Sequence, residues 1–128
     1  MIVLGLRTDK PEAELYLYDG SKKLAELKWQ AHRQLAETIH TKIKLLLDGR
    51  ALSDIGGIVF FEGPGSFTGL RIGASVTNAL AYSLQVPIVA LGGADWLERG
   101  RKQLASGDNQ KLAIPKYGGK INISQPKK

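Results

Sequence analysis

The residues best suited to chemistry lie in one glycine-rich stretch, residues 63–73, with the sequence GPGSFTGLRIG. Such a loop at the start of a helix can present backbone N–H groups to an anion, and the helix dipole favours negative charge there. The spacing differs from both common phosphate signatures: no Gly-Lys-Ser/Thr ending is present, and the glycine pattern is one residue longer than the dinucleotide fingerprint. The loop can equally be structural, with glycines relieving crowding and a hydroxyl capping the helix. Both interpretations stay open for Gly63, Gly65, Ser66, Thr68 and Gly69.

Other reactive side chains form no recognisable constellation. His32 and His40 lie eight residues apart on one expected helix, without a third metal ligand nearby. Ser66 has no identifiable His and Asp partners, and its surroundings are not a nucleophile elbow. Glu62 follows an apolar run, where open α/β sheets place their sites, but a solvated carboxylate is the simpler interpretation. We therefore expect no catalytic residue, no metal and no cofactor.

Hydrophobic periodicity places the loop inside an α/β unit. Alternating and apolar runs predict three antiparallel strands, then helices and strands in turn, in the order βββαβα with a further strand and helix. This order predicts an α/β sandwich with a mixed sheet. The expected elements are strands at 2–6, 12–18 and 22–30, a helix after Ala31 that stops near Asp48, a strand at 57–61, a helix to about Leu84, a strand at 87–91 and a helix at 95–104.

The helix after the loop has more apolar surface than one sheet contact needs. Small or apolar side chains cover roughly 220° of its circumference, about twice what packing on a sheet requires. These residues are Leu70, Ile72, Gly73, Ala74, Val76, Ala79, Leu80, Ala81 and Leu84. The surplus predicts a second neighbour, either the first helix or another protein chain.

Length and composition fit one globular domain in a reducing compartment. The chain has 128 residues, 43% of them hydrophobic, and no cysteine. No window approaches the ~18 unbroken apolar residues of a membrane span. The first residues lack a basic segment and reach Arg7 and Asp9 too soon for a signal peptide. We expect a cytoplasmic protein without membrane contact.

Charge is divided unevenly along the chain. Residues 1–98 hold 10 Lys and Arg against 11 Asp and Glu, a net charge of −1, whereas residues 99–128 hold 8 against 1, a net charge of +7. Such a tail can contact RNA phosphates, or it can simply be solvated. Because Tyr117 is its only aromatic residue, the tail gives little support for base stacking.

The stretch GPGSFTGLRIG closely resembles the signature of the TsaB/YeaZ proteins, which act in bacterial tRNA threonylcarbamoyladenosine synthesis. The start of the first helix at Ala31-His32-Arg33, the Leu45-Leu46-Leu47 run and Val86-Pro87-Ile88 also fit. The resemblance covers about residues 2–105. It implies a ribonuclease-H-like lobe of actin/hexokinase type at residues 1–108, with residues 109–128 as a basic remnant of a second lobe.

The resemblance implies a non-catalytic subunit that binds and activates a TsaD-type transferase. That transferase threonylcarbamoylates adenosine 37 of ANN-decoding tRNA, and a TsaE-type ATPase joins the larger complex. Family members contact TsaD, or pair with themselves, through a bundle formed by the two helices of this lobe. The resemblance therefore implies that tRNA is bound indirectly, through the transferase. The expected interface residues are Leu35, Ile39, Ile43, Arg71, Ile72, Val76, Ala79 and Leu80.

One departure from the family pattern concerns the end of the first strand. Where related phosphotransferases and many family members have Asp-Thr-Ser, this chain has Arg7-Thr8-Asp9. A fixed cation thus replaces the carboxylate that serves metal and phosphate chemistry in the superfamily, and Asp9 lies two residues further on. The alternative hypothesis is a small nucleotide-binding or phosphotransfer enzyme that uses the Gly63–Gly69 loop.

Overall fold

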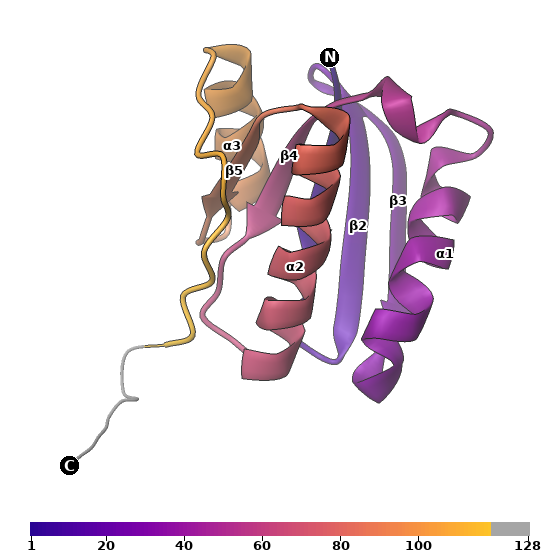
Figure 1. The fold of residues 1–128 in the computed structure, drawn as a ribbon, viewed down its shortest axis with the longest axis vertical. Coiled ribbons are helices and arrows are strands. Elements are labelled where there is room, and N and C mark those ends of the chain that lie inside the picture. The colour runs from indigo at the N-terminus through magenta and orange to yellow at the C-terminus, as the bar shows by residue number, and fades with distance from the viewer. Residues whose placement is uncertain (119–128) are drawn as a thin grey trace.

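A five-stranded mixed sheet with helices on both faces forms the protein, of which the computed structural model describes residues 1–118 (Figure 1). The strand order is β3-β2-β1-β4-β5, with β1–β2 and β2–β3 antiparallel and β1–β4 and β4–β5 parallel. The elements are β1 (Ile2–Arg7), β2 (Glu12–Asp19), β3 (Lys22–Gln30), α1 (Leu35–Leu47), β4 (Ile55–Phe61), α2 (Phe67–Leu84), β5 (Ile88–Leu91) and α3 (Trp96–Ala105), with short 3-10 turns at His32–Gln34 and Leu52–Asp54. The predicted fold class and element order are confirmed.

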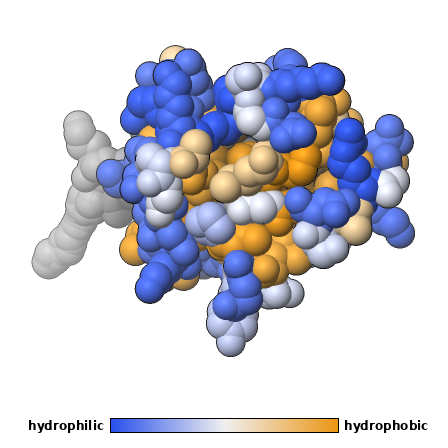
Figure 2. All heavy atoms as spheres, turned by 90° about the horizontal axis from the view of Figure 1, so that it is seen from above, coloured by the Kyte–Doolittle hydropathy of each residue, from blue (hydrophilic) through white to orange (hydrophobic). Residues whose placement is uncertain are grey.

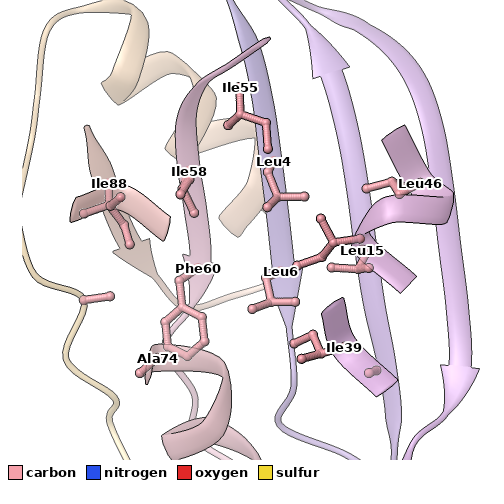
Figure 3. Close-up of a cluster of buried hydrophobic side chains, with 14 of the residues drawn as sticks. Leu4, Leu6, Leu15, Ile39, Leu46, Ile55, Ile58, Phe60, Ala74 and Ile88 are labelled. Atoms are coloured by element: carbon pink, nitrogen blue, oxygen red, sulfur yellow. The ribbon is translucent and has the colours of Figure 1, made fainter. Parts of the chain in front are cut away.

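Helices α1 and α2 lie together on one face of the sheet, and α3 covers the other face (Figure 1). Between the sheet and the helix pair lies the larger apolar core, to which Leu4, Leu6, Ile58 and Phe60 contribute from the central strands (Figure 3). Strands β1 and β4 are apolar along their length because helices cover both of their faces. This rigid centre fixes the carboxyl ends of the parallel strands relative to the start of α2.

The face under α3 differs from the expectation for β2. Alternation over residues 12–18 predicts a half-buried strand with Glu14 and Tyr16 on its polar side, and in the structure Glu14 is buried and Tyr16 half-buried. Trp96 of α3 packs edge-on against Tyr16 and Phe61, with ring centroids 6.1 Å and 5.6 Å apart. The polar side of β2 is therefore more buried than alternation alone indicates, because a helix distant in sequence packs on Tyr16.

Residues after α3 cross back over the outer edge of β5. Gln110 accepts a hydrogen bond from the Ala90 backbone N–H at 3.1 Å and donates one to the Ala90 carbonyl at 3.3 Å. Asn109 accepts from the Ile88 backbone N–H at 3.1 Å. Two short apolar pieces in residues 111–124 predict a hairpin or edge segment, but as far as Gly118 the side-chain amides of Asn109 and Gln110 take the place of a pairing strand. The remainder, including Ile121 and Ile123, lies outside the described residues.

The boundaries of the elements agree with expectation to within about two residues. The first helix ends at Leu47, where Asp48 adopts a left-handed conformation with φ of 48°. Strand β4 begins two residues earlier than expected, at Ile55. Within residues 1–118, no helix combines the length and apolar character that crossing a membrane requires.

Candidate functional site

The glycine-rich loop lies where the carboxyl ends of β1 and β4 meet the start of α2 (Figure 1). Ser66 caps the helix, since its hydroxyl accepts a hydrogen bond from the Gly69 backbone N–H at 3.3 Å. The Ser66 backbone N–H donates to the Asp9 carbonyl at 2.8 Å, and the Thr8 hydroxyl donates to the Gly69 carbonyl at 2.7 Å. The loop is therefore closed onto the turn that follows β1.

The glycines of this loop are explained by the closeness of that contact. A Cβ atom at Gly65 would collide with Asp9, and one at Gly69 or Gly73 would collide with Thr8. Gly63 has a φ of +115°, and a side chain there would meet the carbonyl of Lys116. Packing thus accounts for the four glycines, which supports the structural interpretation, and anion binding at the loop stays a prediction.

Arg7 and Asp9 form a nearly buried ion pair beside the loop. The distances are 2.8 Å between Arg7 Nε and Asp9 Oδ1 and 3.2 Å between Nη2 and Oδ2, a two-pronged arrangement. The guanidinium also lies 3.9 Å from the centroid of the Phe61 ring. The carboxylate at this position is therefore bound by a cation of its own chain.

Tyr16 and Glu14 extend this polar cluster under α3. The Tyr16 hydroxyl donates to the Glu14 carboxylate at 2.5 Å, and Lys10 lies 3.4 Å from the other carboxylate oxygen. Burial, together with the hydrogen bond to Glu14, raises the pKa of Tyr16 above its usual range. Tyr16 therefore stays protonated and keeps donating to Glu14 at neutral pH. Among residues 1–118, no group of three His, Asp or Glu side chains is placed to hold a metal ion.

The predicted interface residues separate into two sets. Leu35 and Ile39 of α1 are buried in the chain's own core, as is Ile43, which also lines a groove beside α2. On α2, Ile72, Val76 and Leu80 are half-buried at the edge of that core, whereas Arg71 and Ala79 are exposed. The apolar arc of α1 thus packs mainly on the chain's own sheet, and the interface set stays a prediction.

An apolar groove runs between α1 and α2. It has a volume of about 320 Å³, and it is lined by the apolar residues Ile43, Leu47, Leu52 and Leu80 and by the polar residues His40, Lys44 and Arg50. Leu52 is 40% exposed. Figure 2 looks down on the end of the molecule where both helices finish and shows apolar residues within a hydrophilic rim. The surplus apolar arc of α2 is thus only partly covered by α1.

One aromatic contact near the loop could not be predicted from the sequence. Phe67, the first residue of α2, packs against Tyr117 with ring centroids 4.4 Å apart. Phe67 belongs to the glycine-rich motif, but the sequence around it does not indicate a contact with a residue fifty positions away. Glu62, expected to be a solvated carboxylate, is half-buried and lies 3.5 Å from the ammonium of Lys116.

Comparisons with known proteins agree with this architecture. A solved structure, YeaZ from Pseudomonas aeruginosa, superposes with a TM-score of 0.67 and 31% identity over 81% of this chain and 50% of that one. The Thermus thermophilus RuvC structure matches 72% of this chain and 64% of its own with a TM-score of 0.52 at 15% identity, which shows the fold alone. Fold and site therefore define a ribonuclease-H-like lobe of the actin-ATPase type.

Sequence comparisons identify the family. The model of the family "TsaD: tRNA N6-adenosine threonylcarbamoyltransferase" matches residues 29–103, more than half of the chain. The Haemophilus influenzae tRNA threonylcarbamoyladenosine biosynthesis protein TsaB is 29% identical over 72% of this chain and 42% of its own. A Thiobacillus denitrificans tRNA N6-adenosine threonylcarbamoyltransferase is 30% identical over 71% of this chain and 32% of its own length. The chain belongs to the TsaB/YeaZ family of tRNA threonylcarbamoyladenosine biosynthesis, and it spans less than half the length of these curated relatives.

Proposed function

We propose that this chain is a non-catalytic scaffold subunit that binds and activates a TsaD-type transferase. The transferase supplies the chemistry, namely threonylcarbamoylation of adenosine 37 in ANN-decoding tRNA. The groove between α1 and α2 carries the proposal, because half-buried Leu80 and exposed Leu52 offer apolar surface that a partner helix can cover, with half-buried Val76 one turn before Leu80 on the same side of α2. The same surface can pair two copies of this chain when the transferase is absent, and a TsaE-type ATPase joins the larger assembly.

The non-catalytic role is supported by the state of the site at the end of β1. Arg7 occupies the place of the superfamily carboxylate, and Asp9 is 8% exposed and held by Arg7. The loop that could bind a phosphate is packed against Thr8 and Asp9. Measurable ATP turnover by the purified chain, abolished by Asp9→Ala, would contradict this part of the proposal.

The domain boundary belongs to the same proposal. We take residues 1–108 as the lobe that binds the transferase and residues 109–128 as a remnant of a second lobe. The segment up to Tyr117 crosses the lobe, with Ala113 buried and bonded to Asn78 through both backbone groups at 2.7 Å and 3.0 Å. It thus lies against α2 through Asn78.

Reconstitution tests the proposal. The TsaD-type subunit of the same cell is supplied with a threonylcarbamoyl-adenylate and an ANN-decoding tRNA, with and without this chain. We expect the chain to raise the rate of modification at least about tenfold, and Leu80→Glu to remove the increase by placing a charge in the apolar contact. An equal rate with and without the chain would show that it is not the activating subunit.

A further inference from the structure

An exposed aromatic pair lies at the start of α2. Phe67 is 54% exposed although it is a large apolar residue, and its ring packs against half-buried Tyr117 at an interplanar angle of 37°. In Figure 1 the segment that carries Tyr117 descends beside the first turn of α2. The pair is at the opposite end of α2 from Leu80, so it lies outside the groove that we propose as the transferase contact.

Two separately anchored segments hold these rings in place. Phe67 directly follows the cap formed by Ser66. Tyr117 is fixed by the backbone before it, because the Lys116 N–H donates to the Glu62 carbonyl at 2.7 Å and Asn78 binds both backbone groups of Ala113. The pair is therefore pre-organised, which lowers the entropic cost of binding a ligand there.

Positive charge surrounds the aromatic pair. The guanidinium of Arg71 lies 5.3 Å from the centroid of the Phe67 ring, one helical turn along α2. The Lys116 side chain next to Tyr117 is 73% exposed, although its ammonium is 3.5 Å from Glu62. The sequence continues with Lys120, Lys127 and Lys128, which lie outside the described residues.

We propose that Phe67, Tyr117, Arg71 and Lys116 form a binding site for single-stranded RNA, in which an unpaired base stacks on the aromatic pair. Proteins recognise unpaired RNA bases by stacking them on aromatic side chains and guanidinium groups, with nearby cations contacting the phosphates. Tyr117 alone could not support this, but the fold adds Phe67 and Arg71 from α2. The cations beside both rings favour RNA over an apolar protein partner. The site would give this subunit a direct contact with the RNA of the proposed function.

Binding of the full chain to two labelled RNAs tests the site. One is a hairpin with an unpaired loop, and the other is a blunt duplex with the same number of phosphates. We expect the hairpin to bind about tenfold more tightly, and Phe67→Ala or Tyr117→Ala to remove that preference, in line with the cost of losing one stacked base. Phe67→Trp and Tyr117→Phe should retain it. Lys116→Gln should weaken the binding of both RNAs equally. It should also make the affinity less dependent on salt, by the amount expected for the loss of about one phosphate contact.

Tyr82 provides the matched control. It is an aromatic residue on the same helix and is 81% exposed, but within the described residues no second ring packs on it and no cation lies over its ring. Tyr82→Ala should therefore leave both affinities unchanged. Equal binding of hairpin and duplex, or an unchanged hairpin affinity in folded Phe67→Ala, would overturn the site. If Phe67→Ala instead weakened only binding to the transferase, the patch would be a protein contact. The scaffold proposal is tested with variants of Leu80, which these RNA measurements do not use. The RNA site and the scaffold role can therefore fail independently of each other.

Discussion

Arg7 holds Asp9 through both carboxylate oxygens, and Asp9 in turn shapes the backbone that receives the glycine-rich loop. The Asp9 carbonyl accepts the Ser66 N–H, and the Asp9 side chain leaves no room for a Cβ atom at Gly65. The ion pair thus also supports the turn on which α2 begins. This gives Arg7 and Asp9 a structural role, which is separate from the proposed absence of catalysis.

Arg7→Ala should lower the free energy of unfolding by about 2 kcal/mol, because it leaves the nearly buried Asp9 carboxylate without its cation. The double variant Arg7→Ala with Asp9→Ala should recover part of that loss. Urea unfolding of the two single variants and the double variant measures the coupling. Strictly additive losses would show that the ion pair contributes no coupling energy.

Gly69→Ala should destabilise the protein by at least about 2 kcal/mol, although glycine to alanine in a helix ordinarily stabilises by about 1 kcal/mol. The reason is the collision of the new methyl group with the carbonyl of Thr8. Ser75→Ala, at an exposed position of the same helix, is the matched control and should change stability by less than about 0.5 kcal/mol. Thermal unfolding of both variants distinguishes close packing from simple helix propensity. A stabilised Gly69→Ala protein would mean that the loop does not contact β1 closely.

Stability should fall as pH rises above about 10 through the titration of Tyr16. Its pKa is raised in the folded protein, so the unfolded chain loses the Tyr16 proton first, and unfolding becomes more favourable above the unfolded pKa. The stability difference between the natural chain and Tyr16→Phe should shrink by about 1 kcal/mol between pH 9 and 11, less than full linkage because Tyr16 is only half-buried. Denaturant titrations at the two pH values measure it. A difference independent of pH would place Tyr16 in an environment no different from water.

Ending the chain after Asp108 should cost the lobe about 3 kcal/mol of stability relative to a chain that ends after Gly118. The longer deletion removes buried Ala113 and the hydrogen bonds that the side-chain amides of Asn109 and Gln110 make with β5. It also frees the β5 edge for pairing with another chain, so self-association should increase. Light scattering and thermal unfolding of the two truncated proteins test both effects. Equal stability of the two would indicate that residues 109–118 contribute nothing to the lobe.

The order of the strands and helices could be predicted because each element has its own hydrophobic periodicity or apolar run. The glycine-rich loop could be predicted because its motif is contiguous in the sequence. Periodicity identified Leu35, Ile39 and Ile43 as apolar but not what covers them, and the chain's own sheet does. Alternation could not show that α3 packs on Tyr16, nor that Tyr117 returns to Phe67. These contacts depend on how distant elements pack, for which a single sequence holds no local signal. The motif likewise revealed the glycines but not Thr8 and Asp9, the residues that require them.

The affinity of the chain for its TsaD-type partner, measured for a matched pair of variants, tests the central claim most directly. Leu80 lines the groove between α1 and α2, whereas Tyr82 lies on another side of the same helix. We predict that Leu80→Glu weakens binding at least about tenfold while circular dichroism shows an intact fold, and that Tyr82→Glu binds like the natural chain. A folded Leu80→Glu protein that binds the transferase with unchanged affinity would contradict the account.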